Sequence, residues 1–202
     1  MKSKYILSTG TIGIIFMMLG QLSFSINDTL VKEIVVDSQN SMSVINVIFF
    51  RGLITTLFIF FYLKFYEKKN MVKIIQVKKY HQRGLYEVLT AIFFFTALIL
   101  LPVAEVYTLL MTNPFFVTIF AFIFLKEKVG IRRWTAVLIG FIGVIFVINP
   151  QHMNFNYLFI FPIIAAVFLT LRDIATKDIA TKTNSFEIIF ITSFLITLFS
   201  GL

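Results

Sequence analysis

The sequence predicts an all-α integral membrane protein, and three observations support that fold class. Hydrophobic residues make up 58% of the 202-residue chain and charged residues only 14%, whereas soluble domains average about 25% charged residues. The mean hydropathy is +0.91. Several apolar runs reach the roughly 17–25 residues that a helix needs to cross a bilayer. Soluble enzymes and nucleic-acid-binding domains are therefore excluded, and the absence of cysteine excludes disulfides and thiol catalysis.

Seven apolar runs are candidates for membrane-spanning helices. In chain order they cover residues 8–31, 44–63, 85–101, 103–125, 134–149, 157–176 and 186–202. The fifth run is short and reaches spanning length only if Ile131 and Trp134 lie in the membrane interface. The third and fourth runs are joined by a very short connection at Leu101-Pro102-Val103, and the fifth and sixth by the short segment from Pro150 to Asn156. The seventh run is still apolar where the sequence stops, so we expect further spans after Leu202.

Basic residues lie on alternate connections, and this pattern predicts the orientation of the chain. With a cytoplasmic N-terminus, nearly all Lys and Arg residues fall in or near inner segments, above all in the segment 64–83. Lys32 is an exception, and Arg51 lies within the second run. Topology and contact with anionic lipid thus explain the net charge of +8, with no need for nucleic acid. The predicted location is the cell inner (plasma) membrane.

An internal repeat relates the first run to the sixth. Ser25 to Ile34 reads SINDTLVKEI and Thr170 to Ile179 reads TLRDIATKDI, so that Asp, Lys and Ile coincide at a constant offset. The second and seventh runs agree as well. A repeat of five spans is odd in number, so successive units enter the membrane inverted, as in many secondary transporters. The sequence predicts one complete five-helix repeat over residues 1–150 and the first two helices of a second, incomplete repeat over residues 151–202.

Short motifs give the chain a resemblance to a known family. They are Phe50-Arg51, Leu101-Pro102-Val103-Ala104-Glu105, Asn113-Pro114, Phe124-Leu125-Lys126-Glu127-Lys128, Arg133-Trp134 and Gly140-Phe141-Ile142-Gly143-Val144. Over essentially its whole length the chain resembles the EamA-type ten-helix members of the drug/metabolite transporter superfamily, truncated after the seventh span. The resemblance implies transport by alternating access, with both termini cytoplasmic. The chain also looks like bacterial members that take up S-adenosylmethionine.

Polar side chains inside the apolar runs are the candidate substrate-binding or gating residues. An ionisable group costs roughly 2.5–3.5 kcal/mol at the centre of a spanning helix and usually faces a cavity or a partner. The candidates share faces of four runs: Gln21, Ser25 and Asp28 on the first, Arg51 and Thr55 on the second, Glu105, Thr108, Thr112 and Asn113 on the fourth, and Arg172 and Asp173 on the sixth.

Three interpretations of Asp28, Arg51 and Glu105 stay open, since all three fall in the outer part of the membrane. They form a static salt bridge that lets Arg51 insert, they contact substrate or gate its path, or they snorkel to the interface. The repeat favours gating. Asp28 then belongs to an outer gate, and its counterpart Asp173, with neighbouring charges, belongs to an inner gate.

Two features concern the shape of the helices. Pro114 removes a backbone donor, so we expect a kink in the fourth run. Gly140 and Gly143 are expected at a position where a neighbouring helix packs closely.

The predicted function is secondary transport of a small polar or amphipathic metabolite: amino acid-like, S-adenosylmethionine-like or drug-like. Small-molecule substrate and membrane lipid are the expected partners, and Asp28 and Glu105 are candidates for proton coupling. No enzyme activity, cofactor or metal is expected, because metal-ligand spacings and Gly-rich phosphate loops are absent from the sequence. Two alternatives stay open: a membrane-embedded enzyme that uses paired acidic residues on lipid-linked substrates, and a non-transporting fragment or assembly partner.

Overall fold

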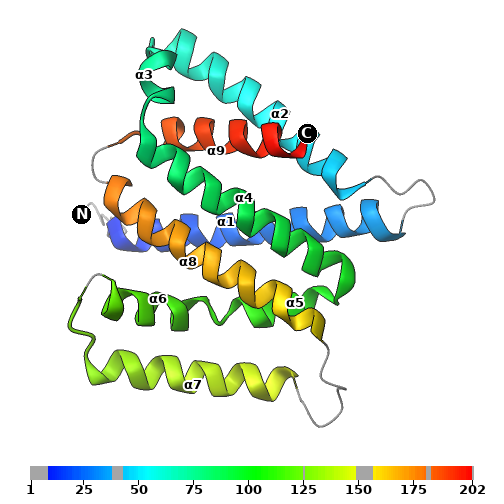
Figure 1. Ribbon diagram of the computed structural model, residues 1–202, viewed down its shortest axis with the longest axis vertical. Coiled ribbons are helices and arrows are strands. Elements are labelled where there is room, and N and C mark those ends of the chain that lie inside the picture. Colours follow the sequence, from blue (N-terminus) through cyan, green and yellow to red (C-terminus); the bar gives the residue numbers. More distant parts are fainter. Residues whose placement is uncertain (1–8, 38–42, 125, 149–156, 181–182, 202) are drawn as a thin grey trace, which may run out of the picture. The chain divides into compact units, whose positions relative to one another are not determined.

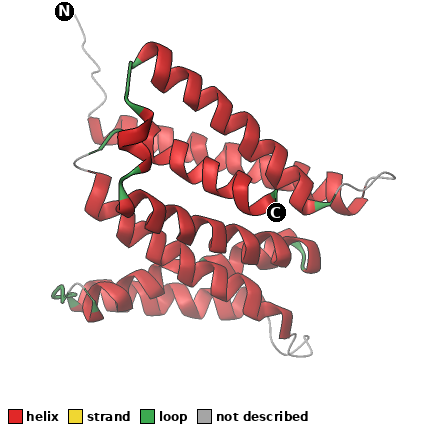
Figure 2. Ribbon diagram, turned by 45° about the horizontal axis from the view of Figure 1, so that its top comes forward, coloured by secondary structure: helices red, strands yellow, loops and turns green. Residues whose placement is uncertain are grey.

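A computed structural model describes residues 9–37, 43–124, 126–148, 157–180 and 183–201. Within these ranges every regular element is a helix (Figure 2), which confirms the predicted all-α class. Five helical segments are long and apolar enough to cross a membrane: Gly10–Val35, Val44–Tyr66, Lys78–Leu100, Val103–Ile123 and Tyr157–Lys177. The chain is therefore a multi-pass membrane protein. It separates into two compact units, Met1–Met42 and Ser43–Leu202.

The first unit contains one long helix. Helix α1 (Thr9–Lys32) continues into a π-helical turn, η1 (Glu33–Asp37). The predicted polar positions of the first apolar run all lie on α1, as the helical spacing of Gln21, Ser25 and Asp28 required. The hydroxyls of Ser23 and Thr29 donate to the carbonyls of Leu19 and Ser25, each at 2.9 Å, so these two donors are satisfied within the helix.

The second unit contains the remaining described helices. In chain order they are α2 (Val44–Phe61), η2 (Tyr62–Tyr66), α3 (Met71–Ile75), α4 (Lys78–Leu100), α5 (Val103–Leu110), α6 (Asn113–Ile123), α7 (Ile131–Ile148), η3 (Tyr157–Phe159), α8 (Ile160–Ala180) and α9 (Ser185–Ser200). Helix α4 begins at Lys78, earlier than the start at residue 85 predicted from hydropathy. Arg83, which the sequence placed in a loop, therefore lies inside a candidate span, and its side chain has partners there that allow the helix to continue.

The break between α5 and α6 has a local cause. Pro114 stands in the first turn of α6, where a missing backbone N–H costs no helical hydrogen bond. Before it, the N–H of Met111 donates to the carbonyls of Tyr107 and Thr108, and the N–H of Thr112 donates to the carbonyl of Leu109. These tight turns end α5 and redirect the chain. The predicted interruption at Pro114 is confirmed.

Helices α4, α8 and α9 form the packed centre of this unit, with α2 against α9 and α5–α6 against α8 (Figure 1). One apolar cluster joins α9 to α2, α3 and α4 through buried side chains that include Leu63, Tyr80 and Ile191. Helices α2 and α9 approach closely because Gly52 has no side chain. A Cβ atom there would lie 2.6 Å from Oγ1 of Thr197, well inside van der Waals contact.

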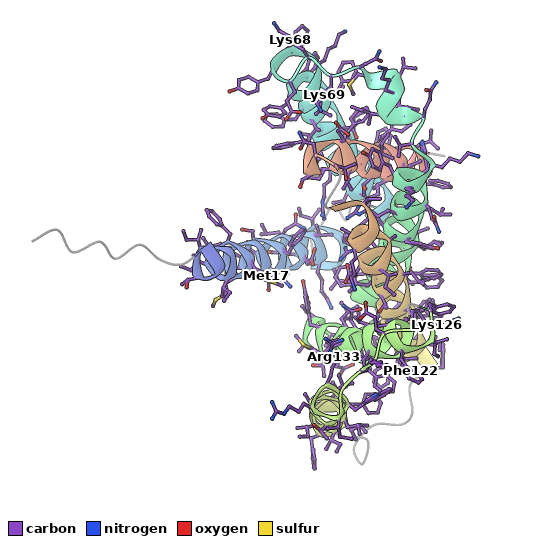
Figure 3. All side chains as sticks on the ribbon, turned by 90° about the vertical axis from the view of Figure 1, so that its left-hand side faces the viewer. Met17, Lys68, Lys69, Phe122, Lys126 and Arg133 are labelled. Carbon is purple, nitrogen blue, oxygen red and sulfur yellow. The ribbon has the colours of Figure 1, made fainter. Side chains whose placement is uncertain are left out.

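Lysines and arginines gather where helices end. Lys68 and Lys69 lie at the turn after η2, Lys126 lies in the connection between α6 and α7, and Arg133 lies in the first turn of α7 (Figure 3). Such clusters at helix ends are typical of spanning helices whose polar termini reach lipid headgroups.

Candidate functional site

Helices α4 and α8 share a network of four charged side chains inside their candidate spans. Nη1 of Arg172 lies 3.2 and 3.3 Å from the two carboxylate oxygens of Glu87. Nε and Nη2 of the same guanidinium lie 3.1 and 2.8 Å from Oδ1 of Asp173. Nη2 of Arg83 lies 3.4 Å from the carboxylate of Glu87. Glu87 is therefore shared by two guanidinium groups that come from different helices.

Two threonines hold the guanidinium of Arg83 on its remaining sides. Nε of Arg83 donates to Oγ1 of Thr176 on α8 at 3.0 Å, and Nη1 donates to Oγ1 of Thr192 on α9 at 2.6 Å. Each threonine hydroxyl donates its own proton to a carbonyl of its helix, that of Arg172 or of Ile188. Their oxygens are left as acceptors only. Arg83 thus ties α4 to both α8 and α9.

The sequence identified half of this network. Arg172 and Asp173 were candidates, Arg83 was placed in a loop, and Glu87 was not singled out. Arg83 and Glu87 stand one helical turn apart, where opposite charges pair on one face. That spacing, just ahead of a long apolar run, is the signal that could have extended the third span to include them. Glu187, a charged residue in the first turn of α9, pairs with Lys69 at 3.1 Å and accepts from the hydroxyl of Tyr80 at 3.1 Å.

The candidates of the outer cluster are distributed over both units. Arg51 is exposed on α2, and its carbonyl accepts a hydrogen bond from Oγ1 of Thr55 at 2.8 Å. Glu105 is half-buried in the first turn of α5. In the described part of the chain Arg51 and Glu105 form no ion pair with each other. Asp28 belongs to the first unit, where it accepts from Nδ2 of Asn27 at 3.0 Å, and its place in the cluster stays a prediction.

The polar candidates at the helix break form two kinds of hydrogen bond, within their own helix or to α8. Oγ1 of Thr108 donates to the carbonyl of Ala104, and Oγ1 of the buried Thr112 donates to the carbonyl of Leu109. The side chain of Asn113 instead reaches α8, where its Oδ1 lies 2.6 Å from Oγ1 of the fully buried Thr170. The break is therefore anchored to the helix that carries Arg172.

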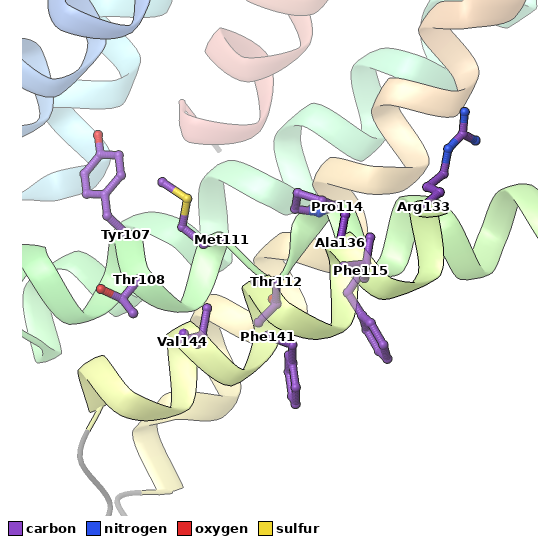
Figure 4. A pocket seen from close by; sticks show the side chains of 13 residues that line it. Tyr107, Thr108, Met111, Thr112, Pro114, Phe115, Arg133, Ala136, Phe141 and Val144 are labelled. Atoms are coloured by element: carbon purple, nitrogen blue, oxygen red, sulfur yellow. The ribbon is translucent and has the colours of Figure 1, made fainter. Parts of the chain in front are cut away.

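A groove of about 660 Å³ runs between the α5–α6 break and α7 (Figure 4). Its lining is mainly apolar and includes Met111, Phe115 and Phe141, while Thr108 and Thr112 border it. Volumes of 300–1,000 Å³ with few polar groups are usual for small-molecule sites. Gly140 and Gly143, expected at a close helix contact, line this groove, and a Cβ atom at either position meets nothing within 4 Å.

The last residue of the candidate span Tyr157–Lys177 makes a further ion pair, with a residue outside the spans. Nζ of Lys177 donates to Oε1 of Glu127, in the connection between α6 and α7. This hydrogen bond and the positive charge of Lys177 lower the pKa of Glu127 below its ordinary value of 4.5. Because both side chains are substantially exposed, solvent weakens the interaction.

Taken together, these features define a class: a multi-pass helical membrane protein with paired charges held between its spans and an apolar groove beside a broken helix. Comparison with known families places it more closely. Residues 11–149 match the EamA-like transporter family, and the chain belongs to that family. The resemblance drawn from the sequence motifs is thus confirmed.

Curated relatives carry transporter names. A riboflavin transporter of Vibrio cholerae is 34% identical over 99 residues, 49% of this chain and 33% of the relative. A pseudopaline exporter of Pseudomonas aeruginosa is 25% identical over 179 residues, 88% of this chain and 61% of the relative. An S-adenosylmethionine uptake transporter of Rickettsia bellii is 26% identical over 184 residues, 91% of this chain and 62% of the relative. The chain thus spans at most about three fifths of these relatives. No solved structure matches it significantly.

Proposed function

We propose that this protein is a secondary transporter that moves a small polar or amphipathic metabolite across the membrane by alternating access. The observation that carries the proposal is the charged network of Arg83, Glu87, Arg172 and Asp173 inside candidate spans. Ionisable groups at such positions mark substrate or ion pathways in membrane proteins. Family membership and the transporter names of the relatives support the same function.

The charged network is the inner gate in this proposal. It joins α4 to α8, so that opening a path between these helices requires its ion pairs to separate or to exchange partners. The outer gate contains Asp28, the counterpart of Asp173 in the repeat, together with Arg51. Gln21, Ser25, Thr55 and Glu105 border the path on the outer side, and Thr108, Thr112 and Asn113 border it near the α5–α6 break.

Two inverted repeats, over residues 1–150 and 151–202, are part of the proposal. At the offset that aligns the second and seventh apolar runs, Thr56 corresponds to Thr197. Oγ1 of Thr56 lies 3.5 Å from Oγ1 of Thr197. Contact between equivalent residues is what a two-fold axis produces, so a pseudo-two-fold axis between α2 and α9 accounts for this contact.

The orientation proposed for the chain has the N-terminus in the cytoplasm and the protein in the inner membrane. Basic residues at the connections after η2 and after α6 support it by the positive-inside rule. Asp28 and Glu105 are the carboxylates proposed for proton coupling, because each lies in a candidate span near its outer end in this orientation.

Transport is tested with cells that express the complete reading frame. Uptake and efflux of labelled riboflavin, S-adenosylmethionine and amino acids are measured against empty-vector cells and an Arg51→Ala variant. Saturable movement of at least one compound, lost in the variant, is the expected result. A correctly inserted protein that moves none of these compounds in either direction contradicts the proposal.

Alternate opening of the gates is tested by labelling. These 202 residues contain no cysteine, so cysteines at positions 28 and 173 can be introduced singly, with any cysteine elsewhere in the protein replaced by serine. A membrane-impermeant maleimide is applied from either side, with and without substrate. Substrate should change the labelling of the two positions in opposite directions. Parallel changes, or none, contradict alternating gates.

A further inference from the structure

The charged network is balanced in charge, and the proposed function makes it the inner gate of the substrate path. Arg83 and Arg172 contribute two positive charges, and Glu87 and Asp173 contribute two negative charges. Each of these groups lies on α4 or α8, in the candidate spans Lys78–Leu100 and Tyr157–Lys177. The inference below deepens the proposed transport function and rests on it, since it concerns which class of substrate the network recognises.

The network is open to an incoming molecule on one side. The side chain of Asp173 is 40% exposed, whereas that of Arg83 is 15% exposed. Arg172 and Glu87 lie between these extremes. Asp173 is therefore the member of the network most accessible to a ligand, and Arg83 is the least accessible.

Glu87 contacts both arginines, and its contacts are longer than those that Asp173 makes with Arg172 at 2.8 and 3.1 Å. Its contacts with Arg172 and Arg83 measure 3.2 to 3.4 Å, longer than the roughly 2.7–2.9 Å of strong charge-assisted hydrogen bonds. The contact between Arg172 and Asp173 is 2.8 Å. A second carboxylate can therefore compete with Glu87 for the guanidinium groups at smaller cost than it can displace Asp173.

Thr176 and Thr192 keep Arg83 in place during such an exchange. Both hydroxyls accept hydrogen bonds from Arg83 and donate their own protons to helix carbonyls. The guanidinium therefore stays oriented when its contact with Glu87 is lost. Thr176 and Thr192 are positioning residues, since they act on a ligand only through Arg83.

We propose that this network binds the carboxylate and ammonium groups of a zwitterionic metabolite of the α-amino-acid type. The ligand's carboxylate pairs with Arg83 and Arg172, and its ammonium pairs with the released carboxylate of Glu87 and with Asp173. The reason is charge balance. A zwitterion exchanges one ion pair for another and leaves the site neutral, whereas an anion or a cation leaves one charge uncompensated at a partly buried position, which is costly.

Binding to purified protein tests the proposal separately from transport. The complete protein is reconstituted in lipid nanodiscs and incubated with a mixture of the twenty ¹⁴C-labelled amino acids, and bound label is identified. The best-bound amino acid is then competed with its N-acetyl derivative, which is an anion, and with its methyl ester, which is a cation. Both derivatives should compete at least about tenfold more weakly than the free amino acid.

Substitutions test whether the amino acid binds at the charged network. Glu87→Gln should weaken binding of the amino acid at least about tenfold, while Glu127→Gln, which neutralises a carboxylate of an exposed ion pair, should leave it unchanged. Asp173→Asn is a second network variant, and its more exposed side chain makes it less damaging to folding. Size-exclusion chromatography of each variant checks that the fold is intact.

The outcomes separate this proposal from the transport proposal. Absence of amino acid binding, equal competition by either charged derivative, or equal binding by the Glu87→Gln and Glu127→Gln proteins overturns the zwitterion site. If cells then still move labelled riboflavin, which has no α-amino-acid group, the transport proposal stands without the zwitterion site. If amino acids bind as expected and nothing is transported, the site stands and the transport proposal fails.

Discussion

Helix α8 carries two ion-paired regions that differ in the number of partners and in the exposure of the basic side chains. Within its candidate span, Arg172 takes part in a network with Glu87, Arg83 and Asp173, and each member has at least one partner in it. A little over one turn later, Lys177 pairs with Glu127. The side chain of Lys177 is 63% exposed, whereas that of Arg172 is 25% exposed. Both regions pair basic side chains with carboxylates, but the network uses two arginines and the second region uses one lysine.

The difference shows what burial does to paired charges. In water an ion pair gains little, because each charge is already well solvated and salt screens the attraction. In a partly buried network each charge depends on its partners, since removal of one leaves another without compensation. The network is therefore expected to matter for folding and function, and the Glu127–Lys177 pair to matter little for either.

Replacement of Glu87 by alanine should have the largest effect. Arg83 and Arg172 then face each other without the carboxylate they share. Breaking a buried pair costs about 3–5 kcal/mol, and the partial exposure of this network reduces the expected loss of stability to about 2 kcal/mol. The fraction of protein that stays monodisperse in detergent after heating measures it. Glu127→Ala is the control. An equal loss of stability in the two variants would show that the network stabilises the fold no more than the Glu127–Lys177 pair does.

The same contrast between packed and open positions applies to two glycines. A Cβ atom at Gly52 would lie 2.6 Å from Thr197, whereas one at Gly140 meets nothing within 4 Å. Gly52→Val should therefore destabilise the protein by about 1–3 kcal/mol through overpacking of α2 against α9. Gly140→Val should cost less in the same heating assay. The close approach of α2 and α9 is refuted if Gly140→Val proves the more damaging change.

A neutral hydrogen bond inside the spans should be worth less than the charged network. Thr170→Val removes the donor that Asn113 accepts at 2.6 Å, and an interhelical bond of this kind contributes about 0.6–1.7 kcal/mol in a membrane protein. Thr96→Val is the matched control, since the hydroxyl of Thr96 bonds to its own helix. Equal melting of the two variants would show that the bond does not hold the helix break to α8.

The smallest effect should come from pH at the exposed pair. Because the pKa of Glu127 is lowered in the folded protein, its contribution is present above the ordinary value of 4.5 and disappears as pH falls through the lowered pKa. The melting temperatures of wild type and Glu127→Gln should differ slightly at pH 7 and converge in acid. A difference that grows as pH falls would mean that folding raises this pKa.

Much of the fold follows from patterns along the chain. The apolar runs predict helices at the described ranges, and Pro114 predicts the break between α5 and α6. The predicted boundary was less accurate at the start of α4, where a charged residue lies inside the span. Hydropathy alone began the third span after Arg83, because an arginine counts as unfavourable in lipid whether or not it has a partner.

The sequence by itself determined that this chain is an all-α membrane protein of the EamA-like transporter family, because hydrophobic run lengths and short motifs are local properties. It also marked Arg172 and Asp173 as charges in need of an explanation. Only the tertiary structure paired Arg172 with Glu87 and placed Arg83 beside the same carboxylate. It also brought Thr192, from another helix, to the guanidinium of Arg83. Residues so far apart in sequence meet through helix packing, and packing depends on the shapes of many side chains at once, which no local pattern encodes.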